Sequence, residues 1–302
     1  MIWGSARDFA EHAVEFLHKE RKQHGEVFTI RLINQYLTVI MDPHSYEAMA
    51  KERNFDFDPI QKQVNWNVFS FILKSPKKMI KDTAKTVRGQ NLSMAMTGFT
   101  QHLDTACQRV HPSNHKQAWA SEGLRMFCAK TMFDAIFNSV FGRADGHDFN
   151  SGMVYKNFDI FHKYFNYFWL GLPKSMFPPA MTALGELLLM PGAEDLLKRE
   201  DLSDYIRTAI HFMKEQGQTE ADIKGHNLVY LHVNYNTFRL AFWVLSNLLE
   251  DEKAMAAVKE ELNQAIYDRL DDETNTARFT IKDVEEMKTL GKFVNHDFYI
   301  KY

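Results

Sequence analysis

The stretch from Asp222 to Glu250 reads DIKGHNLVYLHVNYNTFRLAFWVLSNLLE, contains no proline, and has its single glycine, Gly225, near the start. Apolar residues recur in it at spacings of three and four, which predicts one helix with a broad apolar face: Leu228, Leu231, Tyr235, Phe238, Phe242, Leu245 and Leu249. At about 1.5 Å per residue this helix is about 43 Å long, the width of a whole domain. We therefore expect it to run through a core.

Polar residues interrupt the middle of this apolar stretch: His232, Asn234, Asn236, Thr237 and Arg239. Charged and amide groups are costly to bury without partners. They either face water or line a cavity in which polarity is useful. His226 and His232 are six residues apart, so they lie on different faces of a helix and do not share a metal ion.

The rest of the chain is also mostly helical, with one β signal near the start. A helix is predicted over 5–24, a β-hairpin over about 26–41, where β-branched residues alternate, and a short helix over 45–53. Further helices are predicted at 79–110, 120–141, 154–168, 177–189, 202–216, 252–269 and 282–289. The fold class is mainly α, with a small β-hairpin near the N-terminus.

Composition excludes several classes of function. The net charge is −3, from 36 basic and 39 acidic residues, which does not attract nucleic acid. Cys107 and Cys128 are the only cysteines, too few for a disulfide framework or a four-cysteine zinc site. No apolar run reaches the length of a membrane span, and the N-terminus does not read as a signal peptide. A basic stripe from Lys77 to Arg88 is either a solvated helix face or an anion site.

Four segments, in this order, carry a family resemblance. They are the hairpin region from His24 to Tyr46, the helix region from Trp119 to Arg143, the turn from Gly171 to Phe177, and the helix from Glu252 to Leu262. Together with the long helix, they resemble a cytochrome P450. The similarity is greatest to the branch of cholesterol and oxysterol 7α-hydroxylase, sterol 12α-hydroxylase and prostacyclin synthase. We therefore expect an incomplete P450 fold over residues 1–290, with an I-like helix at 222–250 and a J-like helix at 252–269.

The resemblance implies roles for individual residues. The I helix crosses the heme face in this family, which makes Asn236 and Thr237 the expected catalytic residues. Tyr235 and Arg88 are the expected heme-binding residues, with Arg88 near a propionate. Leu172, Phe177 and His232 are expected to line the substrate channel.

The same resemblance predicts what these 302 residues lack. The K-helix ExxR and the cysteine heme-ligand loop of the family are not expected in this chain, and residues 291–302 read as a tail foreign to the family. Neither Cys107 nor Cys128 falls in the region of the heme ligand, so no metal ligand is expected. Heme belongs to the family, but we expect this chain alone to retain none, to be inactive and to be unstable.

Several functions remain open from the sequence. The first is a fragment of a heme-thiolate monooxygenase that hydroxylates a sterol or lipid, with NADPH–cytochrome P450 reductase as partner. The alternatives are a heme-free pseudoenzyme or partner-binding helical module, an endoperoxide isomerase of the prostacyclin synthase type, and a helical scaffold outside the family. The resemblance implies the cytosolic face of the endoplasmic reticulum membrane, although the chain carries no transmembrane anchor.

Overall fold

The computed structural model describes residues 5–33, 35–52, 54–110, 121–143, 149–268, 270–271, 276–277 and 281–291. The predicted tail at 291–302 therefore lies outside the described residues, apart from Gly291.

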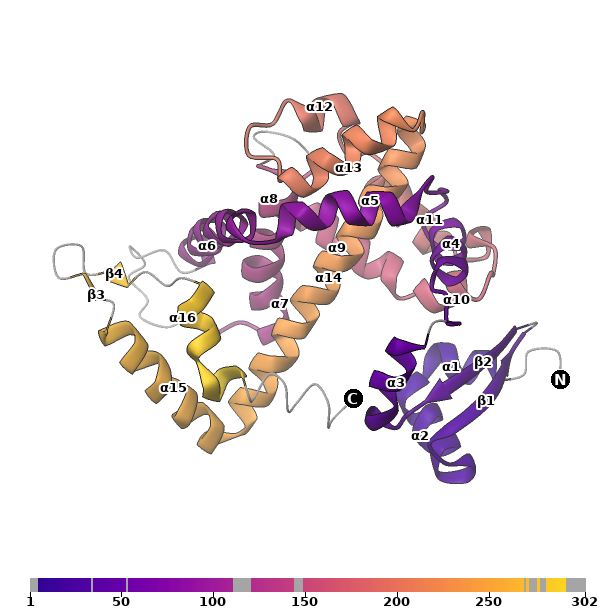
Figure 1. Cartoon of the computed structure of the whole chain (residues 1–302), viewed down its shortest axis with the longest axis horizontal. Helices are drawn as coiled ribbons and strands as arrows, with labels where there is room; N and C mark the ends of the chain where they lie inside the picture. Colours follow the sequence, from indigo (N-terminus) through magenta and orange to yellow (C-terminus); the bar gives the residue numbers. More distant parts are fainter. Residues whose placement is uncertain are drawn as a thin grey trace.

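The predicted long helix is present as α14, which runs for 31 residues from Glu220 to Glu250 and crosses the middle of the molecule (Figure 1). It begins two residues before the predicted start because Thr219 and Asp222 form a capping box. The Thr219 hydroxyl accepts the Asp222 N–H at 3.2 Å, and the Asp222 carboxylate accepts the Thr219 N–H at 3.0 Å. At the other end, Asp251 caps the next helix, α15 (Glu252–Tyr267), by accepting the N–H groups of Lys253 and Ala254.

A small unit at the N-terminus contains the predicted hairpin. Strands β1 (Val27–Leu32) and β2 (Gln35–Ile40) pair antiparallel, with Val27 opposite Ile40. Every second residue of β1 is buried, so Phe28, Ile30 and Leu32 pack on one side against Phe16. The helices of this unit are α1 (Ala6–Glu11), α2 (Ala13–His24), η1 (Pro43–Ser45) and α3 (Tyr46–Lys51).

The other helices form a body around α14 (Figure 1). Before α14 come α4 (Asp58–Asn67), α5 (Pro76–Thr83), η2 (Ala84–Val87), α6 (Gln90–Val110), α7 (Leu124–Cys128), the π-helical turn η3 (Ala129–Phe133), α8 (Asp134–Phe141), α9 (Ser151–His162), α10 (Phe165–Trp169), η4 (Lys174–Met176), α11 (Pro178–Leu187), α12 (Ala193–Leu197) and α13 (Asp204–Glu215). After α15 come β3 (Leu270–Asp271), β4 (Thr276–Ala277) and α16 (Ile281–Glu286). The prediction of a mainly α fold with an N-terminal hairpin is confirmed.

Some predicted boundaries are wrong, and local chemistry explains them. The helix predicted over 79–110 is broken at Gly89, whose φ of 57° ends one helix before α6 begins. The helix predicted over 5–24 breaks at His12, which lies between α1 and α2. The helix predicted over 154–168 divides into α9 and α10. Helices α4 and α12 were not predicted.

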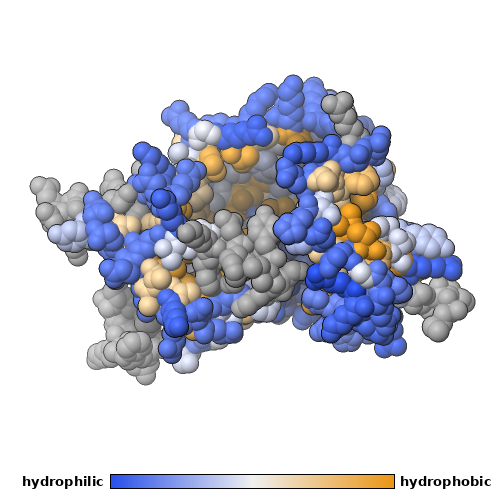
Figure 2. Space-filling view, turned by 60° about the horizontal axis from the view of Figure 1, so that its bottom comes forward, coloured by the Kyte–Doolittle hydropathy of each residue, from blue (hydrophilic) through white to orange (hydrophobic). Residues whose placement is uncertain are grey.

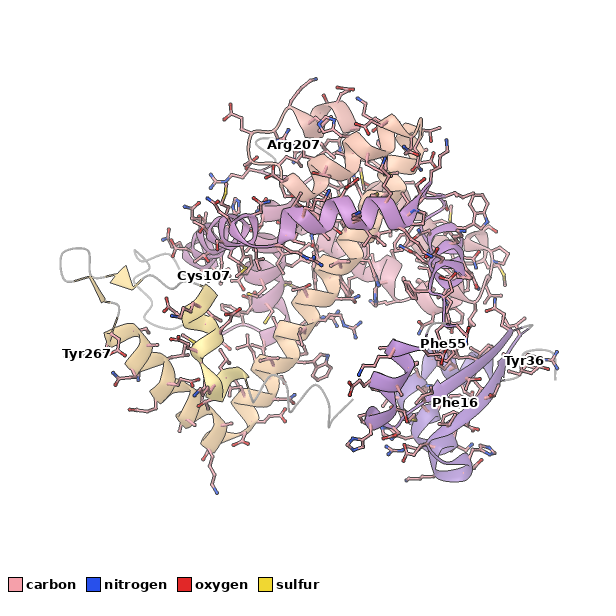
Figure 3. All side chains as sticks on the ribbon, in the orientation of Figure 1. Phe16, Tyr36, Phe55, Cys107, Arg207 and Tyr267 are labelled. Atoms are coloured by element: carbon pink, nitrogen blue, oxygen red, sulfur yellow. The ribbon has the colours of Figure 1, made fainter. Side chains whose placement is uncertain are left out.

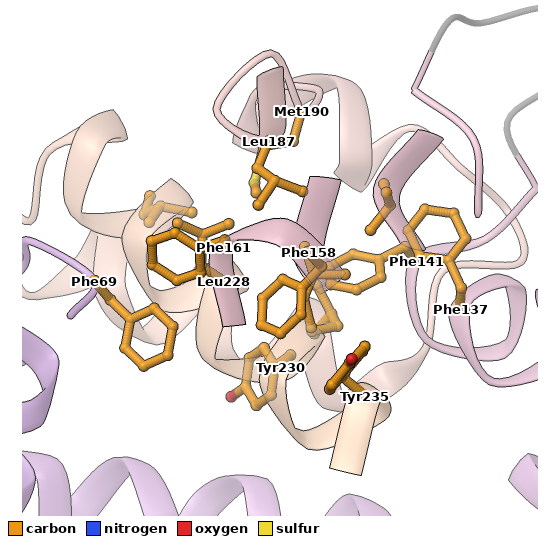
Figure 4. Close-up of a cluster of buried hydrophobic side chains, with 14 of the residues drawn as sticks. Phe69, Phe137, Phe141, Phe158, Phe161, Leu187, Met190, Leu228, Tyr230 and Tyr235 are labelled. Carbon is orange, nitrogen blue, oxygen red and sulfur yellow. The ribbon is translucent and has the colours of Figure 1, made fainter. Parts of the chain in front are cut away.

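The core of the body consists of aromatic and aliphatic side chains packed on α14 (Figure 4). Phe158 and Phe161 of α9 are fully buried, as are Leu228 and Phe238 of α14. Burial of large apolar side chains is the main stabilising contribution in such a core.

One close crossing positions the segment before α5 on the long helix. A Cβ atom at Gly225 would lie 2.9 Å from the Phe69 carbonyl oxygen and 2.9 Å from the Phe71 Cβ. Only glycine, which has no side chain, allows the backbone at 69–71 to approach α14 this closely. Gly225 therefore fixes how this segment lies on the helix.

The buried side of α14 also carries polar groups. His226, Asn227 and Asn234 are each less than a tenth exposed. The His226 Nδ1, both amide atoms of Asn227 and the Asn234 Nδ2 have no hydrogen-bond partner among the described residues. An unpaired buried polar group costs about 1–3 kcal/mol, so this side of α14 reduces stability.

Among the described residues, no helix combines the length and the apolar character that crossing a membrane requires.

We predict that Gly225→Ala destabilises the protein by about 1–3 kcal/mol, because the new methyl group has to displace the 69–71 backbone. The measurement is the free energy of unfolding in urea. The control is Gly185→Ala in α11, where a Cβ has nothing within 4 Å. This change should leave the protein unaffected or up to about 1 kcal/mol more stable. Equal effects of the two substitutions would contradict the close crossing.

We also predict that His226 makes the fold sensitive to acid. Burial lowers the pKa of His226 from 6.5 to about 3, so the unfolded state binds a proton that the folded state does not. Stability is therefore fully present above pH 6.5 and is lost as the pH falls toward 3, by about 1.4 kcal/mol per pH unit. His226→Phe should reduce the slope of stability against pH by about 1.4 kcal/mol per pH unit in urea unfolding measured from pH 6.5 to 4, while the buried His162 and His232 keep their own contributions. The same change at exposed His211 is the control and should leave the slope in place.

Candidate functional site

One side of α14 is open in the middle of an otherwise buried helix. Val233 is 53% exposed, Asn236 and Thr237 are exposed, and Val229 and Leu240 are partly exposed. The spacing of these five residues puts them on neighbouring positions of one side of the helix. We call this set the open face of α14. Figure 2 shows that the underside of the molecule is hollowed and has hydrophobic side chains in the wall of the hollow.

The two predicted catalytic residues both lie on the open face. The Thr237 hydroxyl donates to the Val233 carbonyl at 3.0 Å, which leaves its oxygen free to accept a hydrogen bond. The Asn236 Nδ2 lies 3.1 Å from the His232 Nε2. An amide and a hydroxyl therefore stand side by side among apolar residues, an arrangement that can hydrogen-bond a water molecule or a ligand group.

Tyr235 points away from the open face. It is 2% exposed and packs in the core with Phe158 (Figure 4), since neighbouring helix residues point about 100° apart. Its hydroxyl donates to Asp159 at 2.5 Å and accepts from Arg125 at 3.0 Å. The ring therefore does not crowd the open face, and its predicted contact with a cofactor stays a prediction.

This network ties α7, α9 and α14 together. Burial by itself raises the pKa of Asp159, but the Tyr235 hydrogen bond and the charge of Arg125 outweigh burial and lower the pKa. Burial also raises the pKa of Tyr235, as does Asp159. The carboxylate therefore stays charged and the phenol neutral at neutral pH. No sequence pattern predicts this pairing, because Asp159 and Tyr235 lie 76 residues apart.

His232 lies at the edge of the open face, inside a group of aromatic rings. Its ring stacks on Phe165 of α10 at 4.6 Å and on His162 of α9 at 5.4 Å. Burial, together with the charge of Arg239, lowers its pKa to about 4, so the imidazole is neutral at neutral pH. His162, which sequence reasoning missed, has its pKa lowered to about 3 by burial and by His232.

The remaining predicted residues lie on other elements. Arg88 is exposed at the end of η2 and has no hydrogen bond or ion pair with α14 in the part of the chain that the structure describes. Leu172 and Phe177 lie in the turn between α10 and α11, where Phe177 packs on Tyr164 at 5.2 Å. The structure thus brings together His232, Asn236 and Thr237, but not Arg88, Leu172 or Phe177.

A second concave region lies between α6, α7 and α9. This groove has a volume of about 1380 Å³, and none of its lining residues belongs to α14. Its acidic residues are in ion pairs, such as Asp134 with Arg109 and Glu122 with Lys130. It is therefore separate from the predicted catalytic residues.

The resemblance implies a heme iron, and the two cysteines are the side chains that could supply its thiolate ligand. Cys128 is fully buried in α7, and Cys107 is exposed on α6 (Figure 3), so neither thiol lies on the open face. Burial raises the pKa of both thiols, which disfavours the thiolate that binds iron. The cysteines therefore do not fit this group as ligands.

Comparisons with known proteins identify relatives over most of the chain. No protein-family model matches it. The chain is 26% identical to cytochrome P450 7A1 of Sus scrofa over 87% of its own length and 55% of the relative. It is 28% identical to 5-beta-cholestane-3-alpha,7-alpha-diol 12-alpha-hydroxylase of Sus scrofa, over 89% of the chain and 56% of the relative. Prostacyclin synthase of Rattus norvegicus is 23% identical, over 87% and 56%.

The chain spans about half the length of the curated relatives it matches. Its helical body, N-terminal hairpin and long buried helix agree with these similarities. The relatives that the chain matches over about 87% of its length are all cytochrome P450s, among them a 7A1 enzyme, a sterol 12α-hydroxylase and prostacyclin synthase.

Proposed function

We propose that this chain forms the helical, substrate-facing part of a heme-thiolate monooxygenase that acts on a sterol or a related lipid. The observation that carries the proposal is the open face of α14, where Asn236 and Thr237 stand between the apolar side chains of Val233 and Leu240. Such a surface suits a large apolar ligand with few polar groups. The named relatives support the class, because one is a hydroxylase of a cholestane diol.

In this proposal Asn236 and Thr237 hold water or substrate oxygen at the open face. The Thr237 oxygen accepts a hydrogen bond from the water or the substrate, while the Thr237 hydroxyl itself donates to the Val233 carbonyl. Proton transfer through positioned groups of this kind is a common contribution to catalysis. Heme, when bound, supplies the activation of oxygen.

We further propose that these 302 residues do not hydroxylate a substrate by themselves. Cys107 and Cys128 are the only cysteines, and neither side chain reaches the open face. A thiolate ligand would have to come from outside this sequence. The alternative is a heme-free protein that binds a lipid at the same face.

The extent of the domain, the substrate route and the redox partner are proposed from the relatives. We propose one P450-like domain over residues 1–290, with Leu172 and Phe177 beside the substrate route and Arg88 as a contact of the heme. Tyr235, which is buried and bonded to Asp159, would act on the heme side of α14 only by holding the helix in place. A hydroxylase of this type would take electrons from NADPH–cytochrome P450 reductase at the endoplasmic reticulum membrane.

We predict that the chain binds a sterol without heme and that Val233→Asp weakens this binding at least about tenfold, because a carboxylate next to the apolar ligand loses its water. The probe is radiolabelled 5β-cholestane-3α,7α-diol, measured by equilibrium binding. Val14→Asp on α2 is the matched control, since Val14 is 55% exposed on a helix outside the open face. Saturable binding that Val14→Asp preserves is the expected result. Absence of binding, or equal loss in both variants, would contradict the proposal.

A further inference from the structure

The side-chain amide of Asn236 is held in one orientation. Its Nδ2 lies 3.1 Å from the His232 Nε2, and an amide nitrogen can donate a hydrogen bond but cannot accept one. The His232 Nε2 is therefore the acceptor, and the ring proton resides on Nδ1. Because the pKa of His232 is lowered to about 4, the ring carries no second proton at neutral pH that would reverse this bond. The amide oxygen of Asn236, Oδ1, is then left for a ligand.

Packing fixes the His232 ring that holds this amide. The Phe165 ring lies 4.6 Å from it with an angle of 10° between the ring planes, and the His162 ring lies 5.4 Å away with an angle of 19°. The His232 Nδ1 is buried and has no hydrogen-bond partner among the described residues, so no other polar group there turns the ring. A side chain locked by packing positions the group that it binds more accurately than a mobile one.

The neighbouring Thr237 adds a second acceptor. Its hydroxyl hydrogen is already donated to the Val233 carbonyl at 3.0 Å, so its oxygen is left to accept. The Asn236 Oδ1 has no hydrogen-bond partner in the part of the chain that the structure describes. At this point the open face therefore presents two oxygen acceptors and one remaining donor, the second hydrogen on the Asn236 Nδ2.

This balance of acceptors and donors distinguishes two kinds of oxygen on a sterol. A hydroxyl group both donates and accepts, so it can pair with either acceptor and with the remaining amide hydrogen. A ketone oxygen only accepts, so it leaves both acceptors against an apolar ligand without a partner. Polar groups that lose water without gaining a partner weaken binding, and sites that bind a hydroxyl group discriminate against analogues that lack it.

From this geometry we propose that His232 is a positioning residue that turns the Asn236 amide oxygen to the open face, so that this face selects a sterol with a hydroxyl group over the matching ketone. The inference rests on the proposed function for the sterol itself, and it adds which oxygen group the site recognises. The recognising contact is a hydrogen bond from the sterol hydroxyl to the Asn236 Oδ1 or to the Thr237 oxygen.

The first test compares two sterols that differ only in these groups, 5β-cholestane-3α,7α-diol and 5β-cholestane-3,7-dione, in equilibrium binding to the purified chain. We expect the diol to bind at least about tenfold more tightly. His232→Phe keeps an aromatic ring against Phe165 but removes the acceptor nitrogen, so the amide can turn and donate to a ketone. The ratio of the two affinities should then fall to about one. His162→Phe is the matched control, because it changes a ring of the same cluster that is not bonded to Asn236, and it should keep the wild-type ratio.

A purely structural role for His232 gives a different result, since lost packing weakens the binding of both sterols and leaves their ratio unchanged. That outcome in His232→Phe would overturn the proposal, as would equal binding of the two sterols by the wild-type chain. Failure of the wild-type chain to bind either sterol would overturn the proposed function as well. Equal binding of both overturns the inference alone, so the two failures are distinguishable.

A second measurement needs neither a ligand nor a variant. NMR of the isotope-labelled wild-type chain at neutral pH should show an unprotonated His232 Nε2 and a coupling across the hydrogen bond to the Asn236 Nδ2. A protonated Nε2, or an assigned spectrum without this coupling, would contradict the amide orientation on which the inference depends.

Discussion

The close crossing at Gly225 is the constraint on which the body of the protein depends. It allows the backbone of Phe69 and Phe71 to lie directly on α14. Phe69 then reaches His232 and the rings of α9 and α10, so one glycine connects the early part of the chain to the aromatic core. A long helix with a side chain at this position would hold its neighbours further away and leave the core open.

The long helix divides its polar residues between two environments. His226, Asn227 and Asn234 are buried, while Asn236 and Thr237 are exposed. The buried set lowers stability, because the His226 Nδ1, both amide atoms of Asn227 and the Asn234 Nδ2 have no hydrogen-bond partner among the described residues. The exposed set stands on apolar surface and can act on a ligand. The similarity to cytochrome P450s is the basis for proposing that the exposed set faces a ligand.

Much of the fold could be predicted from sequence, because long apolar periodicity is a strong signal. The helix at 222–250 and the hairpin at 26–41 are both present. The break at Gly89 was missed, since apolar spacing continues on both sides of a glycine with positive φ. Asn236 and Thr237 could be placed by resemblance. The burial of Tyr235 and its bond to Asp159 could not, because they depend on how α9 packs on α14.

The most direct test of the account is a reduced carbon monoxide difference spectrum of this chain, expressed with heme supplied. The account predicts no band of the thiolate type, because Cys128 is buried in the core and Cys107 lies on α6. A thiolate-type band, lost on substitution of either cysteine, would contradict the account and make that cysteine the iron ligand.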